Sequence, residues 1–245
     1  MLDAGVTVTR TGDDFLRYHG KYMVADDVLS LFAFNFTTAD TTKSRSFGVW
    51  TKDKSAVREA LVLFEADCTR QPYSANRRSP LVVSPETARD TLTAFIKGAK
   101  RQLLIYDVNI QDPAFIKLLK QLAANGVDIR VIGKFKGAGD AIGVRSLKPL
   151  RLHARAIIRD GARAFVGSQS LRRPELNQRR EVGVVITNGA VARKLRDIFE
   201  ADWLESAASK EEKKEDKKLI EADIIKPPAA PVVAEFVPPK SRRLA

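Results

Sequence analysis

The chain has 245 residues, with 42 Lys and Arg against 30 Asp and Glu and a formal net charge of +12. Its hydrophobic fraction of 44% allows a sizeable core, but no apolar run approaches the roughly 18 residues that a membrane span needs. No signal peptide is visible, so a cytoplasmic or peripheral membrane location is expected for the chain as it stands. One cysteine and two histidines exclude an intrachain disulfide framework, a multi-thiolate metal site and a three-histidine zinc site.

The positive charge lies in the part of the chain that we expect to fold. Residues 205–245 contain nine Lys and Arg and eight Asp and Glu, which leaves 33 against 22, or +11, in residues 1–204. A basic folded part favours an anionic partner, such as nucleic acid, a phospholipid head group or a phosphate ester. Solubility alone explains the same charge equally well.

The predicted elements fall into two units and a tail. The first unit, residues 1–78, is short and contains two successive strands, separated by a turn at Asp26-Asp27. The second unit, residues 79–204, alternates strands and helices, which predicts an α/β sandwich with a mixed sheet. Its strands are expected at 81–83, 103–108, 127–132, 152–159, 164–167 and 181–187, and its helices at 84–100, 113–125 and 191–203.

The tail, residues 205–245, changes character. A mixed charge run over 210–218 is followed by a Pro-rich stretch that begins at Pro227. This composition predicts a short solvated helix and then a disordered extension.

The two units repeat each other. Phe64-Glu65-Ala66-Asp67 recurs as Phe199-Glu200-Ala201-Asp202 at an offset of 135 residues, and His19-Gly20-Lys21 recurs as His153-Ala154-Arg155 at an offset of 134. Two kinds of landmark at nearly one offset indicate a duplication. The first unit has no counterpart of the section between residues 81 and 151, so we expect its start to be missing or to be supplied by a partner.

Both histidines lie in the pattern His-x-Lys/Arg-x4-Asp, which ends at Asp26 or Asp160. On a strand, residues two apart share a face, so each imidazole is expected beside a cation. This pair suits a phosphate ester, because the ring can attack or protonate while the cation neutralises the non-bridging oxygens. The two Asp residues suit the turns that end these strands equally well.

With the strands that follow them, these motifs resemble the phospholipase D superfamily, within which the chain looks most like bacterial phospholipase D-like and cardiolipin synthase-like proteins. The resemblance covers residues 5–204, and it implies a duplicated phospholipase D-like α/β sandwich with mixed sheets and an incomplete N-terminal half. It also implies a ping-pong mechanism that needs neither metal nor cofactor. In this mechanism one histidine forms a phosphohistidine and the other protonates the leaving alcohol.

The resemblance also implies roles for individual residues. His19 is expected to be the nucleophile and His153 the acid and base, an order that the symmetry of the sequence leaves open. Glu181 is expected to orient the ring of His153. The residues that would hold phosphate oxygens are Lys21, Arg155 and Asn35, with Ser168 or Ser170 assisting.

Four positions depart from the family pattern. Arg155 stands for Lys, Ala33 for a hydroxyl residue, Ser170 for Asn, and Ser46 for the carboxylate of the first unit. His19 is therefore left without an obvious orienting carboxylate. The leading hypothesis is a phosphodiesterase or phosphatidyltransferase that acts on phospholipids at a membrane surface. The alternatives are a nuclease or nucleic-acid-binding protein of the same superfamily and a non-catalytic scaffold.

Overall fold

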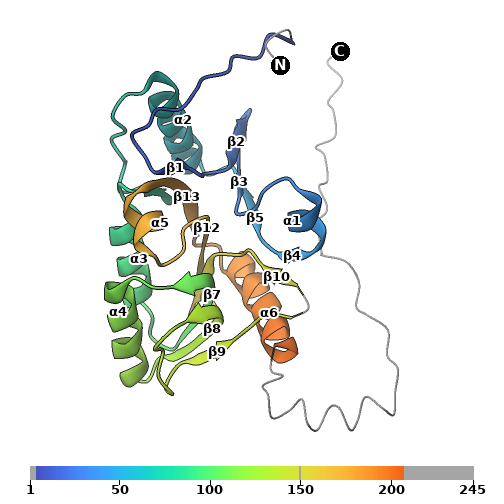
Figure 1. The fold of residues 1–245 in the computed structure, drawn as a ribbon, viewed down its shortest axis with the longest axis vertical. Coiled ribbons are helices and arrows are strands. Elements are labelled where there is room, and N and C mark those ends of the chain that lie inside the picture. The colour runs from blue at the N-terminus through green and yellow to red at the C-terminus, as the bar shows by residue number, and fades with distance from the viewer. Residues whose placement is uncertain (1–3, 149, 207–245) are drawn as a thin grey trace. The chain divides into compact units, whose positions relative to one another are not determined.

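A mixed eight-stranded sheet forms the centre of the structure, a computed structural model that describes residues 4–148 and 150–206 (Figure 1). Seven of its strands form a continuous row of hydrogen-bonded neighbours, and the eighth strand, β6, pairs with β13 outside this row. In sheet order they are β1 (Arg17–Tyr18), β13 (Arg179–Ile186), β12 (Arg163–Gly167), β11 (Ala156–Arg159), β7 (Gln102–Ile110), β8 (Asp128–Phe135) and β9 (Gly143–Arg145), with β6 at Leu81–Ser84.

Two smaller sheets contain strands of the first unit. One has the order β2 (Tyr22–Ala25), β3 (Val28–Phe32) and β5 (Gly48–Thr51), and the other pairs β4 (Ser44–Arg45) with β10 (Arg151–Leu152). The helices are α1 (Thr38–Thr42), α2 (Lys54–Thr69), α3 (Ala88–Lys97), α4 (Pro113–Ala124), α5 (Arg173–Asn177) and α6 (Gly189–Glu205).

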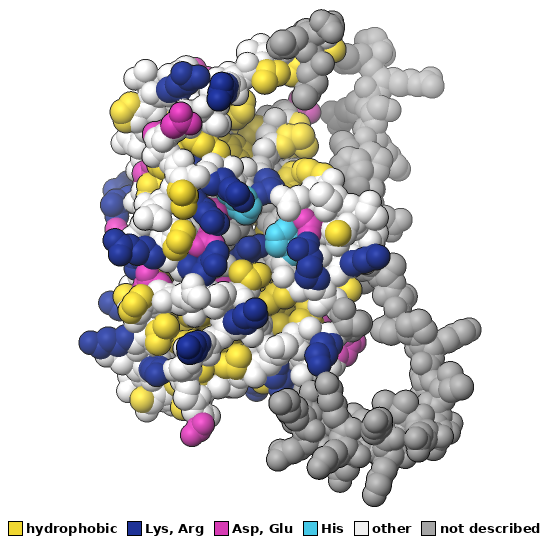
Figure 2. Space-filling view, in the orientation of Figure 1, with side chains coloured by type: hydrophobic (Ala, Val, Ile, Leu, Met, Phe, Trp, Pro, Cys, Tyr) yellow, Lys and Arg dark blue, Asp and Glu magenta, His cyan; other side chains and the backbone are white. Residues whose placement is uncertain are grey.

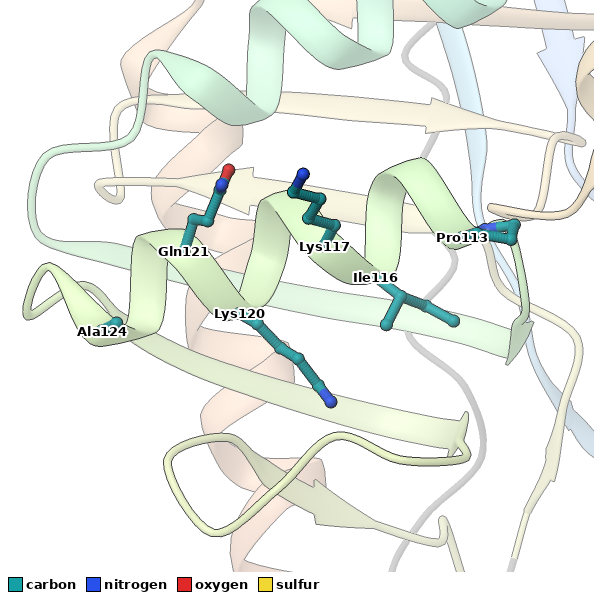
Figure 3. Close-up of a pocket in the computed structure, with 6 residues that line it drawn as sticks. All are labelled: Pro113, Ile116, Lys117, Lys120, Gln121 and Ala124. Carbon is teal, nitrogen blue, oxygen red and sulfur yellow. The ribbon is translucent and has the colours of Figure 1, made fainter.

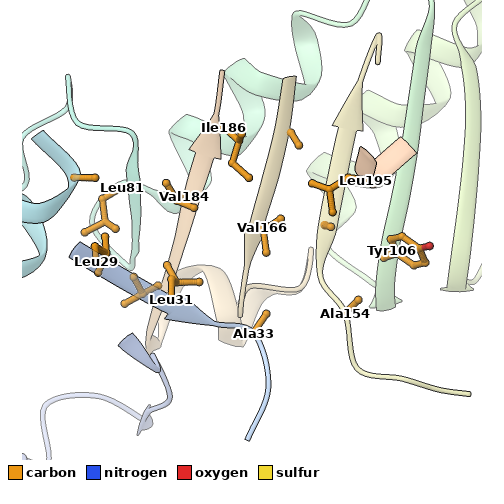
Figure 4. Close-up of a cluster of buried hydrophobic side chains, with 14 of the residues drawn as sticks. Leu29, Leu31, Ala33, Leu81, Tyr106, Ala154, Val166, Val184, Ile186 and Leu195 are labelled. Atoms are coloured by element: carbon orange, nitrogen blue, oxygen red, sulfur yellow. The ribbon is translucent and has the colours of Figure 1, made fainter. Parts of the chain in front are cut away.

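The main sheet separates two hydrophobic clusters, because successive strand residues point to opposite faces. On β7, Leu103 and Ile105 pack with α3 and α4, whereas Leu104 and Tyr106 pack with α6. The cluster that contains α6 continues into the first unit, where side chains of α2 and of the inner side of β3 belong to it. Figure 4 shows side chains of β3 next to those of β12 and β13 in this cluster. The predicted α/β class with mixed sheets is therefore confirmed.

Side chains at the helix starts explain where the helices begin. Asp53, Asp112 and Asn188 each accept hydrogen bonds from backbone N–H groups in the first turn of α2, α4 and α6, which satisfies donors that have no partner inside the helix. The predicted start of α3 at Ser84 is wrong. Ser84 is the last residue of β6, and the helix begins after Thr87.

The predicted strand over 152–159 is also wrong. It is broken into β10 and β11, and residues 153–155 lie between them. His19 and Lys21 lie likewise between β1 and β2. The predicted charged helix and Pro-rich extension of the tail lie outside the described residues.

Crossed pairs join the repeated units. Strand β1 of the first unit runs parallel to β13 of the second, and β10 of the second runs parallel to β4 of the first. Asp202 accepts two hydrogen bonds from Arg45, at 2.6 and 2.7 Å, and its repeat equivalent Asp67 accepts one from Arg180 at 3.1 Å. Each of these ion pairs thus joins a residue of the first unit to a residue of the second.

These crossed pairs lead to a prediction on stability. Asp202 is buried and also accepts from the hydroxyl of Tyr106, so its removal leaves the partly buried charge of Arg45 and a buried hydroxyl without this partner. We expect Asp202→Ala to lower the free energy of unfolding by about 3 kcal/mol in urea denaturation. Asp197 on the same helix forms an exposed pair with Arg196, and Asp197→Ala is the control, expected to cost less than about 1 kcal/mol. Equal costs for the two variants would show that the crossed pair does not stabilise the fold.

Candidate active site

The two histidines occupy equivalent places where the units meet. The backbone N–H of His19 donates to the carbonyl of Arg180 at 2.8 Å, and that of His153 donates to the carbonyl of Arg45 at 3.0 Å. Both histidine side chains lie on the face drawn in Figure 2, with Lys and Arg side chains around them. The short parallel pairs β1–β13 and β10–β4 therefore bring the two motifs to one site.

Glu181 pairs with the histidine of the other unit. Its Oε2 lies 2.8 Å from Nδ1 of His19, and its side chain is fully buried. A carboxylate can only accept, so the ring nitrogen donates and the lone pair of Nε2 is left free. Our expectation that Glu181 orients His153 is therefore wrong. It contacts His19, the ring that the sequence left without an orienting carboxylate.

Asp40 takes the corresponding place beside His153. Its Oδ1 lies 3.0 Å from Nδ1 of His153, within ion-pair distance, and its side chain is 1% exposed. Its other oxygen accepts from the backbone N–H of Asn35 at 3.0 Å and from the side-chain amide of Asn35 at 2.8 Å. Arg151 and Asp40 also form an ion pair. Each histidine is thus paired with a buried carboxylate from the opposite unit.

Sequence reasoning missed Asp40, although two signals were present. Asp40 lies on the short helix α1, and at an offset of 135 it matches Glu175 on the short helix α5, which is also buried and paired with arginine. Arginine also precedes each histidine by two residues, as Arg17 and Arg151. The repeat therefore extends to Arg-x-His-x-Lys/Arg, and the partner of Arg151 is the missed carboxylate.

The environment of this second pair shifts both of its pKa values. Burial alone would raise the pKa of Asp40, but the hydrogen bonds from Asn35 and the charges of His153 and Arg151 outweigh it and hold that pKa below its usual range. Burial lowers the pKa of the His153 ring, and Arg155 and Arg151 lower it further, whereas Asp40 opposes the change. The net effect is a pKa of the His153 ring below its ordinary value, with Asp40 as the group that holds the proton on the ring.

The cations of the two motifs also take equivalent positions. Lys21 Nζ donates to the carbonyl of His19 at 2.7 Å, and an Arg155 guanidinium nitrogen donates to the carbonyl of His153 at 2.9 Å. Burial lowers the pKa of Lys21, Arg155 adds to this effect, and the carboxylates of Glu181 and Asp40 oppose it. Groups from both units therefore act on one ammonium group, as expected of a single site.

The remaining predicted residues lie around this centre in supporting positions. The hydroxyl of Ser168 exchanges hydrogen bonds with the backbone of Val182, and the hydroxyl of Ser170 lies 3.4 Å from Nε of Arg155. Asp26 and Asp160 have φ angles of 53° and 54° in the turns after β2 and β11. Asp160 also accepts from the backbone N–H groups of residues 100–102. The two Asp residues therefore have turn roles.

Other features of the described residues lie apart from this site. The pocket in Figure 3 lies along α4 and is lined by Pro113, Ile116, Lys117, Lys120, Gln121 and Ala124, none of which belongs to either histidine pair. No group of three or more His, Cys, Asp or Glu is arranged to hold a metal ion within residues 4–148 and 150–206. In the same ranges, no helix has the length and apolarity to cross a bilayer.

The fold and the paired motifs define a duplicated α/β protein with two crossed histidine–carboxylate pairs. Residues 92–203 match the sequence profile of the family described as "Cardiolipin synthase, PLD-like domain". The match lies in the second unit and covers slightly less than half of the chain, and it supports a place in the phospholipase D superfamily. No protein with a curated description matches the sequence.

The solved structures that resemble this chain include a kinase and a synthase. Polyphosphate kinase from Porphyromonas gingivalis aligns with a TM-score of 0.67 at 18% identity, over 82% of this chain and 37% of the kinase. Phosphatidylserine synthase from Haemophilus influenzae aligns with a TM-score of 0.58 at 11% identity, over 76% of this chain and 62% of the synthase. The chain spans less than two thirds of either protein, and at these identities the likeness concerns the fold.

Proposed function

We propose that the protein is a metal-independent phosphodiesterase or phosphatidyltransferase of the phospholipase D type that acts on phospholipids through a phosphohistidine. The observation that carries this proposal is the crossed pairing of His19 with Glu181 and of His153 with Asp40. Each carboxylate fixes one side of an imidazole and leaves the other side for chemistry. Two such rings beside partly buried cations suit a two-step displacement at phosphorus.

In the first step His19 is the nucleophile. Its Nδ1–H is held by Glu181, so the lone pair of Nε2 attacks phosphorus and forms a P–N bond. The bond from phosphorus to the leaving oxygen breaks, and that oxygen takes a proton from His153 and departs as an alcohol. Glu181 stabilises the positive charge that develops on the ring of His19.

In the second step His153 acts as the base. It takes the proton of a water molecule or an acceptor alcohol, whose oxygen attacks phosphorus while the P–N bond breaks. The electron pair returns to Nε2 of His19, and His153 is protonated again for the next cycle. Water yields a phosphomonoester, and an alcohol yields a new phosphodiester.

Lys21 and Arg155 are suited to bind the non-bridging oxygens. Their positive charges lie beside the two rings, and an entering phosphate anion would compete for the hydrogens that they now donate to backbone carbonyls. The contacts of Asn35 and Ser170 support other roles than the direct phosphate binding that we expected. Asn35 acts through Asp40 and Ser170 through Arg155, so both are positioning residues. Ser168 supports the backbone of β13.

An aromatic cluster beside the site favours a lipid substrate. Phe32, Phe34 and Phe36 pack edge to face, with ring centroids 4.8–5.7 Å apart, and Phe36 is 73% exposed. Asn35, whose side chain binds Asp40, lies within this cluster in the sequence. An exposed apolar patch at the edge of a phosphate site suits the hydrophobic part of a phospholipid.

The lipid assignment is tested by a comparison of substrates. We expect the protein to release the head group from phosphatidylglycerol in mixed micelles faster than it cleaves a single-stranded oligonucleotide. Replacement of Phe36 by Ser should lower the rate on micelles several-fold and leave the rate on a soluble phosphodiester unchanged. Equal losses on both substrates would contradict a lipid-binding role of the cluster.

A nuclease is the second candidate, and the charge of +11 on residues 1–204 favours it. Binding to nucleic acid releases counterions, so its affinity falls steeply with salt. Faster cleavage of the oligonucleotide than of the lipid, with an affinity that falls about tenfold or more between 50 and 200 mM salt, would support this candidate.

A further inference from the structure

No other element of the described part of the chain covers the outer side of the small sheet β2–β3–β5. Met23, Ser30 and Trp50 pair with one another across the three strands and therefore lie in one row. Met23 is 54% exposed and Trp50 52% exposed. Leu29 and Leu31 point to the opposite side of β3 and are buried in the core. We call the row of Met23, Ser30 and Trp50 the open row.

The second unit contains the same row in a covered form. Strands β11, β12 and β13 repeat β2, β3 and β5, and their equivalent row is Ile157, Phe165 and Val185. Ile157 is 3% exposed and Phe165 1% exposed, and both pack in the cluster that contains α3 and α4. In the second unit, α3 and α4 therefore cover this row.

Strand β2 also has a free edge. Within the described residues its one neighbour is β3, whereas its counterpart β11 has the antiparallel strand β7 on the other side. The backbone N–H of Phe32 donates to the carbonyl of Lys21, so the backbone groups of Lys21 point toward β3. Along β2, the backbone groups of successive residues point alternately toward β3 and away from it. The N–H and C=O groups of Tyr22 and Val24 therefore point outward, where a strand can pair with them.

Helix α2 exposes an apolar side chain whose repeat equivalent on α6 is buried. Phe64 is 57% exposed, but its repeat equivalent Phe199 is fully buried, with its ring centroid 4.9 Å from that of Tyr106 on β7. Leu61, one turn earlier, is 50% exposed. A counterpart of β7 would therefore cover Phe64 and pair with the edge of β2 at the same time.

We propose that the first unit is a docking site for a strand–helix segment of another polypeptide. The strand of this segment pairs antiparallel with β2 and packs on Phe64, and its amphipathic helix covers the open row. A second copy of this chain could pair through β2, but its own open row would remain uncovered. A lipid surface could cover Trp50, but it offers no hydrogen bonds to the free edge of β2.

The test uses the full chain and a synthetic peptide with the sequence of residues 101–136, the β7–α4–β8 unit that fills this place in the second unit. We expect the peptide to bind one to one and to slow hydrogen exchange of the Tyr22 and Val24 amides at least tenfold. The Val24→Pro variant removes an outward N–H without breaking a bond to β3, so it should lose this protection. Should that variant misfold, Trp50→Ser is expected to weaken the protection instead.

The controls separate the other occupants. Leu204→Ser changes an apolar side chain of similar exposure on α6 and should leave peptide binding unchanged. No change in amide exchange on addition of the peptide would overturn the proposal. Protection that depends on protein concentration without peptide, with a dimer in sedimentation, would assign the edge to a second copy. Protection by anionic phosphatidylglycerol vesicles but not by the peptide would assign the face to a membrane. The readout is amide exchange, so it is independent of catalysis.

Discussion

The His153→Ala variant is expected to release about one p-nitrophenolate per chain from bis(p-nitrophenyl) phosphate in a burst and then to stall. This leaving group departs without a proton donor, so attack by His19 still occurs. Hydrolysis of the P–N bond needs His153 as the base, so this second step stops in the variant. Rapid acid-free quenching and mass spectrometry should then find the p-nitrophenyl phosphoryl group on His19.

The His19→Ala variant is the counterpart of this experiment. Without the nucleophile we expect no burst and a turnover at least about 10⁴-fold slower than that of the wild type. Both imidazoles are partly exposed, but each substitution leaves a buried carboxylate without its histidine partner, so circular dichroism and urea denaturation are needed to establish that both variants are folded. A phosphoryl adduct on His153 in the His19→Ala variant would reverse the assigned order of the two histidines.

The Asp40→Asn variant is expected to lose about 100-fold in kcat/KM, and a carboxylate at position 46 should restore most of this loss. Ser46 follows Arg45 as Glu181 follows Arg180, and Arg45 and Arg180 bind the two histidine backbones in the same way. In the double variant Asp40→Asn, Ser46→Glu, the new carboxylate therefore occupies the position from which Glu181 reaches His19. Asp140→Asn, an exposed change elsewhere in the chain, is the control.

The pH dependence of the same variants assigns the role of His153. The negative charge of Asp40 raises the pKa of this ring, so its removal lowers that pKa further. If His153 is the general acid, the falling limb of the pH profile of kcat/KM moves to lower pH in Asp40→Asn. In the double variant this limb moves back toward its wild-type position. The chain has two histidines, so their NMR signals report the shift directly. An unchanged titration of His153 in Asp40→Asn would exclude the pairing.

Much of this site was predictable from the sequence, because a duplicated motif places equivalent residues in equivalent positions. The repeat of His19 and Lys21 as His153 and Arg155 predicted one shared site, and the alternation of elements predicted the mixed sheet. The partners of the histidines were not predictable in this way. Glu181 follows the second motif in the chain, but the parallel pair β1–β13 brings it to His19.

Asp40 was missed for a related reason. The family pattern places the second carboxylate at Ser46, and Asp40 reaches the site from α1, six residues earlier. Its role depends on long-range contacts with His153 and Arg151, more than 100 residues away, which local spacing does not encode. The exposed row of Met23 and Trp50 became informative only when the structure showed its covered equivalent in the second unit.

The most direct test of the central claim is turnover of a soluble chromogenic phosphodiester in the presence of EDTA. The two-histidine mechanism predicts that the wild-type protein is active under these conditions and that His19→Ala and His153→Ala both lose multiple turnover. An active protein whose rate is unchanged by either substitution would contradict the assigned site. A wild-type protein without turnover would contradict the catalytic account and favour a scaffold that retains the fold of the family.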